Sequence, residues 1–118
     1  MVRLFLAVLL ALTATAAAAE PRNGAFTGSG KYNTSGTVVV DGRTLRLQRN
    51  FNFQGAPDAR LAFGNARSAD RGTIFARLQR NKGAQNYTVP RNVNTNGYSH
   101  VWLWCKRFNV PLGRAALR

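Results

Sequence analysis

Short runs of alternating apolar and polar residues recur along the chain after residue 36, separated by clusters of glycine, proline and asparagine. Successive side chains of a β-strand point to opposite faces, so this alternation predicts strands that each bury one face. The runs are spaced roughly ten residues apart, as in small β-sandwiches. They predict strands within residues 37–40, 44–48, 51–53, 59–63, 74–78, 85–89, 99–108 and 113–118.

A helical pattern is missing from the same region of the sequence. After residue 19, no segment keeps apolar residues at positions i, i+3, i+4 and i+7 over three turns. We therefore predict an all-β fold for residues 20–118, a small single-domain β-sandwich, jelly-roll-like, built of short antiparallel strands.

One hairpin can be predicted in detail. Asp41-Gly42 separates the first two runs, and Asp-Gly favours a type I′ turn, in which both central residues have positive φ. In the second run, Leu45 and Leu47 are expected to face the core, with Arg46 and Gln48 in water.

The remaining segments give weaker patterns. Residues 20–36 are rich in small polar residues and are expected to form an irregular entry segment, and residues 64–72 and 92–97 are expected to be polar loops. In the run 74–78, the inward set is expected to be Ile74, Ala76 and Leu78, opposite Phe75 and Arg77. Asn109-Val110-Pro111 is expected to break the chain before a last strand, in which Ala115 and Leu117 close the sheet.

The N-terminus has the layout of a secretory signal peptide. A short basic start is followed by the apolar run 4–12 and by small residues that end at Ala19. The apolar run is far shorter than the roughly 20 residues needed to cross a bilayer. We therefore expect cleavage near Ala19 and a secreted or periplasmic protein, with residues 1–19 as the signal peptide.

The chain is strongly basic, with 17 lysines and arginines, 4 acidic residues and a formal net charge of +13. Such a surface carries a strong positive field. Anionic partners are therefore expected outside the cytoplasm, namely lipid headgroups through peripheral membrane contact, an acidic polymer or an acidic protein. No nucleic acid partner is expected for an exported chain. A general compositional bias toward arginine and alanine is the alternative explanation.

The titratable residues exclude most hydrolytic enzymes. The chain has one histidine and one cysteine, and its acidic residues are three aspartates and Glu20. These residues cannot supply a Ser-His-Asp triad, a pair of catalytic carboxylates or a His/Cys metal cluster at ordinary spacing. No metal site is predicted.

The rarest residues gather in the stretch 99–108. Alternation places Val101, Leu103 and Cys105 on one face of a central strand and His100, Trp102 and Trp104 on the other. His100 and Cys105 therefore cannot form a nucleophilic pair or bind one metal ion together. The two tryptophans could line an apolar ligand site or simply pack in the core.

Cys105 has no partner for an intramolecular disulfide. The thiol is therefore buried and inert, linked to another chain as in a Cys105-linked homodimer, or kept for reactivity. Lys106 and Arg107 follow directly, and neighbouring cations favour the reactive thiolate. The position near a strand end also favours access.

Several motifs carry a family resemblance over nearly the whole of residues 20–118. They are Gly24-x-Phe26, Thr34-Ser35-Gly36-Thr37, Gly55-Ala56-Pro57-Asp58, Gln85-Asn86-Tyr87-x-x-Pro90 and Trp104-Cys105-x-x-Phe108. In this order they resemble the electron-transfer DM family, the DM-thirteen domain.

The resemblance implies a small extracytoplasmic β-sandwich with a redox role centred on its one shared cysteine, which corresponds to Cys105. That cysteine would act as a bare thiol, and would work with a redox partner protein, or would hold a prosthetic group such as haem. Cofactor-binding candidates are Cys105, Trp104 and His100, although the ligand spacing does not support haem. The cofactor stays unknown.

This chain departs from the family at two places. Tyr32 stands where members often have histidine, and Arg49-Asn50 stand where they often have acidic residues.

The competing prediction is a non-catalytic extracytoplasmic binding module, which uses its basic surface for anionic partners while Cys105 merely packs.

Overall fold

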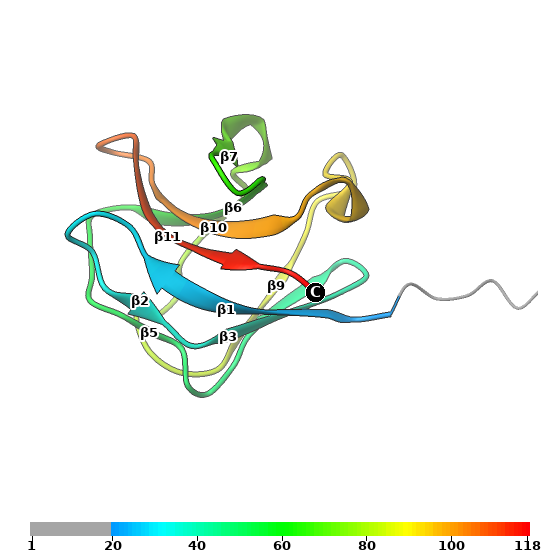
Figure 1. The fold of residues 1–118 in the computed structure, drawn as a ribbon, viewed down its shortest axis with the longest axis horizontal. Coiled ribbons are helices and arrows are strands. Elements are labelled where there is room, and N and C mark those ends of the chain that lie inside the picture. Colours follow the sequence, from blue (N-terminus) through cyan, green and yellow to red (C-terminus); the bar gives the residue numbers. More distant parts are fainter. Residues whose placement is uncertain (1–19) are drawn as a thin grey trace, which may run out of the picture.

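The strands of residues 20–118, the part of the chain that the computed structural model describes, pair mainly into one antiparallel sheet (Figure 1). Its order is β7 (Ala69–Asp70), β6 (Ala59–Gly64), β10 (His100–Cys105), β11 (Val110–Ala116), β1 (Arg22–Gly28), β3 (Thr37–Asp41), β4 (Thr44–Leu47) and β9 (Gln85–Thr88). The short strand β8 (Ala76–Arg77) also pairs with β6, and β2 (Thr34–Ser35) pairs with β5 (Asn52–Phe53) in a second, two-stranded sheet.

Helical structure in the described region is limited to two 3₁₀ turns, η1 (Arg71–Thr73) and η2 (Thr95–Gly97). Within residues 20–118, no helix has the length and apolar character that a membrane span requires. The predicted signal peptide, residues 1–19, lies outside the described residues.

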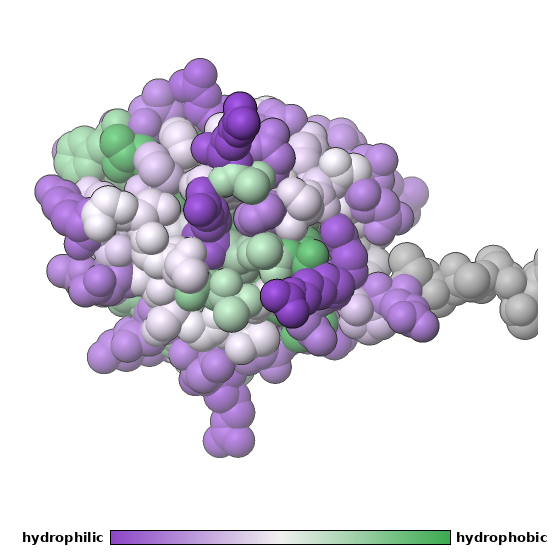
Figure 2. All heavy atoms as spheres, in the orientation of Figure 1, coloured by the Kyte–Doolittle hydropathy of each residue, from purple (hydrophilic) through white to green (hydrophobic). Residues whose placement is uncertain are grey.

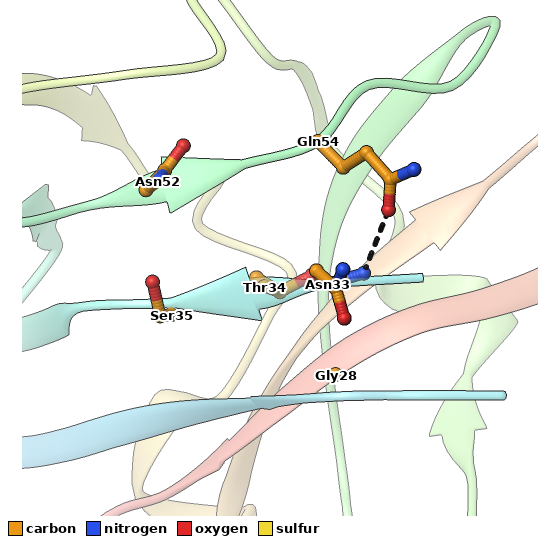
Figure 3. Close-up of a pocket in the computed structure, with 6 residues that line it drawn as sticks. All are labelled: Gly28, Asn33, Thr34, Ser35, Asn52 and Gln54. Carbon is orange, nitrogen blue, oxygen red and sulfur yellow. Dashed lines mark hydrogen bonds between the residues drawn. The ribbon is translucent and has the colours of Figure 1, made fainter. Parts of the chain in front are cut away.

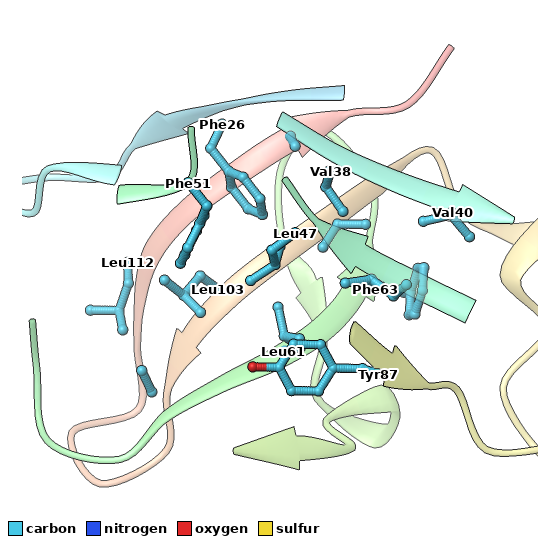
Figure 4. Close-up of a cluster of buried hydrophobic side chains, with 14 of the residues drawn as sticks. Phe26, Val38, Val40, Leu47, Phe51, Leu61, Phe63, Tyr87, Leu103 and Leu112 are labelled. Carbon is cyan, nitrogen blue, oxygen red and sulfur yellow. The ribbon is translucent and has the colours of Figure 1, made fainter. Parts of the chain in front are cut away.

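The sheet curls so that its two halves pack against each other. Figure 4 shows side chains of β3 and β4 facing side chains of β6, β10 and β11 across the core. The largest fully buried side chains include Phe51, Phe53, Phe63, Leu45, Leu61, Leu103 and Leu112. The predicted all-β, sandwich-like single domain is confirmed, with both layers supplied mainly by one curled sheet.

The β3–β4 hairpin confirms the predicted faces and corrects the predicted turn. Leu45 and Leu47 are buried in the core, whereas Arg46 is exposed. Asp41 pairs with Thr44, so the turn residues are Gly42 and Arg43, and only Gly42 has positive φ. This is the pattern of a type II′ turn, with glycine at the first central position.

The entry segment is not irregular, because its residues Arg22–Gly28 form β1, a central strand between β11 and β3. Gly24 and Phe26 face inward and their neighbours point outward. A Cβ on Gly24 would lie 2.6 Å from the carbonyl oxygen of Ala116 on β11. The inward positions thus alternate, but one of them needs glycine, which hid the apolar period.

Three further predictions need correction around β6. Phe75, predicted to point away from the core, packs against it and stacks on Phe63 with ring centroids 6.0 Å apart. Ile74 is not part of the core, because it caps η1. The predicted polar loop 64–72 contains β7 and most of η1, which pair with or pack on β6.

The predicted chain break at residues 109–111 is also wrong, because Val110 and Pro111 belong to β11. The register shifts where Leu103 pairs with Gly113 and Trp104 pairs with Pro111, so Leu112 is an extra residue in β11. A bulge of this kind accommodates a proline that cannot donate to the ladder. The strand runs between β10 and β1 and does not form a closing edge.

Candidate functional site

β10 separates its six side chains between two environments, as the alternation predicts. Val101, Leu103 and Cys105 belong to the core cluster, which does not include His100, Trp102 or Trp104. His100 and Cys105 also occupy opposite ends of the strand. The described structure therefore keeps the imidazole and the thiol apart.

Cys105 is a free cysteine that lies at the end of three paired strands. It pairs with Ala59, the first residue of β6, and with Val110, the first residue of β11. Its exposed fraction is 0%, and its Sγ donates a hydrogen bond to the carbonyl oxygen of Pro57 at 3.0 Å. The position near a strand end thus does not expose the thiol, because another segment covers it.

That segment is residues 55–58, the last four residues of the connection between β5 and β6, and we call it the thiol cover. Two of its residues have positive φ, Gly55 at 114° and Asp58 at 54°. Positive φ is uncommon for a residue other than glycine, although aspartate adopts it more often than most. Ala56 packs against the core, and the backbone N–H of Lys106 donates to the Asp58 carbonyl at 3.1 Å.

The carboxylate of Asp58 binds two arginines of neighbouring strands. Its Oδ1 lies 2.7 Å from Nε of Arg60 and 3.2 Å from an Nη atom of Arg77. The hydrogen bond from Arg60 is the main cause that lowers the pKa of Asp58 below its ordinary value. Desolvation of the carboxylate opposes this effect, and the hydrogen bond from Arg77 lowers the pKa further. These contacts fix the C-terminal end of the thiol cover to the sheet.

On the outer face of β10, Trp102 is covered by the loop that follows β6. Its Nε1 donates to the carbonyl oxygen of Asn65 at 2.9 Å, and the Arg114 guanidinium lies 5.7 Å from its ring centroid. Trp102 is only 3% exposed. It is therefore packed within the protein and does not line a ligand site.

The other two outer residues of β10 have different surroundings. His100 is half-buried, with Nδ1 2.7 Å from Oγ of Ser99, and burial together with the charge of Arg114 lowers its pKa below the ordinary value. Trp104 is half-buried, and its Nε1 is the one buried side-chain nitrogen or oxygen of residues 20–118 without a hydrogen-bond partner.

These surroundings do not fit a prosthetic group held by Cys105. The sulfur is enclosed by core side chains and the thiol cover, and Trp104 and His100 lie on the opposite face of the strand. A group bound to the sulfur would have to displace packed side chains. In the described part of the chain, no three residues of the His, Cys, Asp and Glu types gather as a metal site would need.

A polar pocket of about 390 Å³ lies beside β2 and β5 (Figure 3). It is lined by Gly28, Asn33, Thr34, Ser35, Asn52 and Gln54. Within it, the Gln54 side chain accepts a hydrogen bond from the backbone N–H of Asn33 at 3.3 Å. Its lining offers amides and hydroxyls without a titratable group, so it can hydrogen-bond but cannot supply acid–base chemistry.

An apolar groove of about 560 Å³, which was not predicted from the sequence, lies between the β1–β2 loop and the β10–β11 hairpin. It is lined by Ser29, Gly30, Lys31, Tyr32, Phe108, Val110 and Pro111. Phe108 is 56% exposed and is the only exposed large hydrophobic residue among residues 20–118. A lone aromatic residue directly after Lys106-Arg107 was the available signal.

Comparison with known proteins identifies a family that this chain matches. Residues 26–117 match the model of a protein family described as electron transfer DM13. Neither the curated proteins nor the solved structures gave a significant match. The matched range includes all of β10, the thiol cover and the β10–β11 hairpin.

Proposed function

Because the chain belongs to the electron transfer DM13 family, we propose that it is an exported redox domain in which the thiol of Cys105 performs the electron-transfer chemistry. The family supports a redox-related role, and Cys105 is the one cysteine of the chain. The observation that carries the proposal is the hydrogen bond from the Cys105 Sγ to the Pro57 carbonyl oxygen. The segment that lies over the sulfur is therefore a connection between strands and not a strand of the sheet.

Opening of the thiol cover would expose the sulfur without separating any strand from the sheet. Residues Gly55–Asp58 lie between β5 and β6, outside both strands. The contacts to be broken are the Cys105–Pro57 and Lys106–Asp58 hydrogen bonds, the ion pairs of Asp58 and the packing of Ala56 on the core. Local openings of this kind require less free energy than global unfolding.

The proposed step is thiol–disulfide exchange with a partner protein. The Cys105 thiolate attacks one sulfur of a partner disulfide, a new S–S bond forms, and the partner's S–S bond breaks. The departing sulfur takes the electron pair and then the proton that Cys105 released. Cys105 is oxidised to a mixed disulfide, and the departing sulfur is reduced to a thiol.

Native-state thiol titration tests this proposal. We expect a small aromatic disulfide reagent to modify Cys105 much faster than the protein unfolds globally, and mass measurement to locate one added group. Cys105→Ala serves as the unreactive control. Modification only at the rate of global unfolding, in a protein without visible absorption, would contradict the redox role of Cys105.

The complete burial of Cys105 favours a second function, a non-catalytic binding module in which the thiol only packs. This function predicts that Cys105→Ala leaves partner binding unchanged and that binding falls steeply with salt. A Cys105-linked homodimer is a third arrangement, which a dimer band on non-reducing gels would reveal.

A further inference from the structure

We propose that the end of the molecule formed by the β1–β2 loop and the β10–β11 hairpin binds the surface of an anionic phospholipid bilayer. Phe108 enters the interfacial region, while Lys31, Lys106 and Arg107 contact lipid phosphates. We call this end the loop end. The proposal does not depend on the redox chemistry of Cys105.

The first observation is the exposure of Phe108 at a turn. Figure 2 shows a hydrophobic patch at the upper left, the corner at which Figure 1 places the β10–β11 hairpin. Phe108 is 56% exposed there, and Tyr32, Val110 and Pro111 continue the apolar surface into the groove behind it. Exposed apolar surface of this kind is typical of a binding site.

The second observation is the distribution of charge around the apolar surface. Lys106 and Arg107 directly precede Phe108 and are exposed. Lys31 lines the other side of the groove, with its Nζ 5.5 Å from the Tyr32 ring centroid. The acidic residue that contacts the hairpin backbone, Asp58, is already paired with arginines. The loop end therefore presents three cations around one aromatic side chain.

A bilayer fits these features better than an acidic protein does. A stable protein interface generally buries more than about 1,000 Å² with close shape complementarity. The loop end offers a single protruding aromatic residue, and Figure 2 shows mostly hydrophilic residues around the patch. A bilayer surface needs no lateral complementarity, since the ring enters the interface while long cationic side chains remain at the headgroups.

The geometry also allows a matched control. Arg71, Arg91 and Arg118 are exposed, and all three lie away from the loop end. The backbone of Arg118 bonds to Asn23 near the start of β1, whereas the loop end follows the last residue of β1. Arg91 follows β9. Arg71 lies in η1, which packs on β6, and the last residue of β6 pairs with His100, at the end of β10 opposite the hairpin. A triple Gln variant of these arginines loses the same charge as a triple Gln variant of Lys31, Lys106 and Arg107.

The test is sedimentation with vesicles of phosphatidylcholine alone and of phosphatidylcholine with phosphatidylserine. Residues 20–118 contain the whole described core, and using them keeps the apolar residues 4–12 away from the lipid. We expect binding only to the anionic vesicles. Phe108→Ala should weaken it about tenfold, and the loop-end triple variant should weaken it much more than the control triple.

A second measurement uses Phe108→Trp. Its fluorescence should shift to the blue and be quenched by lipids brominated near the headgroup, relative to the unmodified chain with Trp102 and Trp104. The proposal is overturned by equal losses in the two triple variants, by absence of vesicle binding, or by lack of quenching. Equally tight, Phe108-independent binding to soluble polyglutamate would overturn it in favour of an acidic protein partner.

Discussion

Cys105 and Pro57 are 48 residues apart in the sequence, yet the thiol donates a hydrogen bond to the proline carbonyl at 3.0 Å. Proline has no backbone N–H to donate, but the Pro57 carbonyl oxygen accepts this hydrogen bond from Cys105, the last residue of β10. The contact joins the thiol cover to the strand that carries the one cysteine. The sulfur is therefore covered by a segment distant in sequence.

Weakening the thiol cover should increase the reactivity of Cys105. Asp58→Asn removes the ion pairs with Arg60 and Arg77, while asparagine still tolerates the positive φ at this position. We expect native-state modification of Cys105 to become several-fold faster, measured at constant pH. Asp41→Asn is the matched control, because Asp41 makes only a long, exposed contact of 4.0 Å with Arg46. Equal rates in both variants would contradict the role of the cover.

Removal of the sulfur should have a moderate effect on stability. Cys105→Ala leaves a small cavity in a fully buried site and should lower the free energy of unfolding by about 1–2 kcal/mol. Urea denaturation measures the change. A loss below about 0.5 kcal/mol would mean that the sulfur contributes little packing.

The faces of β10 could be predicted from the sequence because alternation has a period of two and does not depend on distant contacts. Val101, Leu103 and Cys105 lie inward as expected. The cover over the thiol could not be predicted in this way, since it depends on where residues 55–58 return to the sheet. The same limit applies to Phe75, whose position follows from its stacking on Phe63.

Strand β1 was missed for a different reason. Its inward positions include Gly24, which supplies no apolar side chain and so leaves no hydrophobic alternation to detect. The exposure of Phe108 had one signal in the sequence, the charged residues Lys106-Arg107 directly before it, but that signal could not predict the groove that Phe108 lines with the β1–β2 loop. Both cases require knowledge of which segments lie beside one another in the fold.

Gly24 should be intolerant of any side chain. In Gly24→Ala, the new Cβ would approach the backbone oxygen of Ala116 to 2.6 Å, and that oxygen belongs to β11 and cannot rotate away. We expect a loss of roughly 1–3 kcal/mol in unfolding free energy. Gly97→Ala is the control, since its nearest neighbour would be the Asn94 side chain at 3.4 Å. Its change should stay within about 0.5 kcal/mol.

The pKa of His100 should lie below its ordinary value because burial and the charge of Arg114 both disfavour the imidazolium ion. A group with a lower pKa in the folded state binds fewer protons there than in the unfolded chain. The contribution of His100 to the free energy of unfolding should therefore be fully present above about pH 6.5, the ordinary histidine pKa. It should be lost as the pH decreases through the pKa of folded His100. His100→Gln should remove this part of the pH dependence of unfolding.

NMR gives the direct measurement, because the chain has a single histidine and its ring protons give one titration curve. Arg114→Gln should raise the pKa of His100 toward the ordinary value, whereas Arg91→Gln, at an exposed position in the loop after β9, should leave it unchanged. If Arg114→Gln leaves the curve in place, burial alone lowers the pKa. A His100 that titrates at or above the ordinary value in the unmodified protein would contradict the described packing of β10.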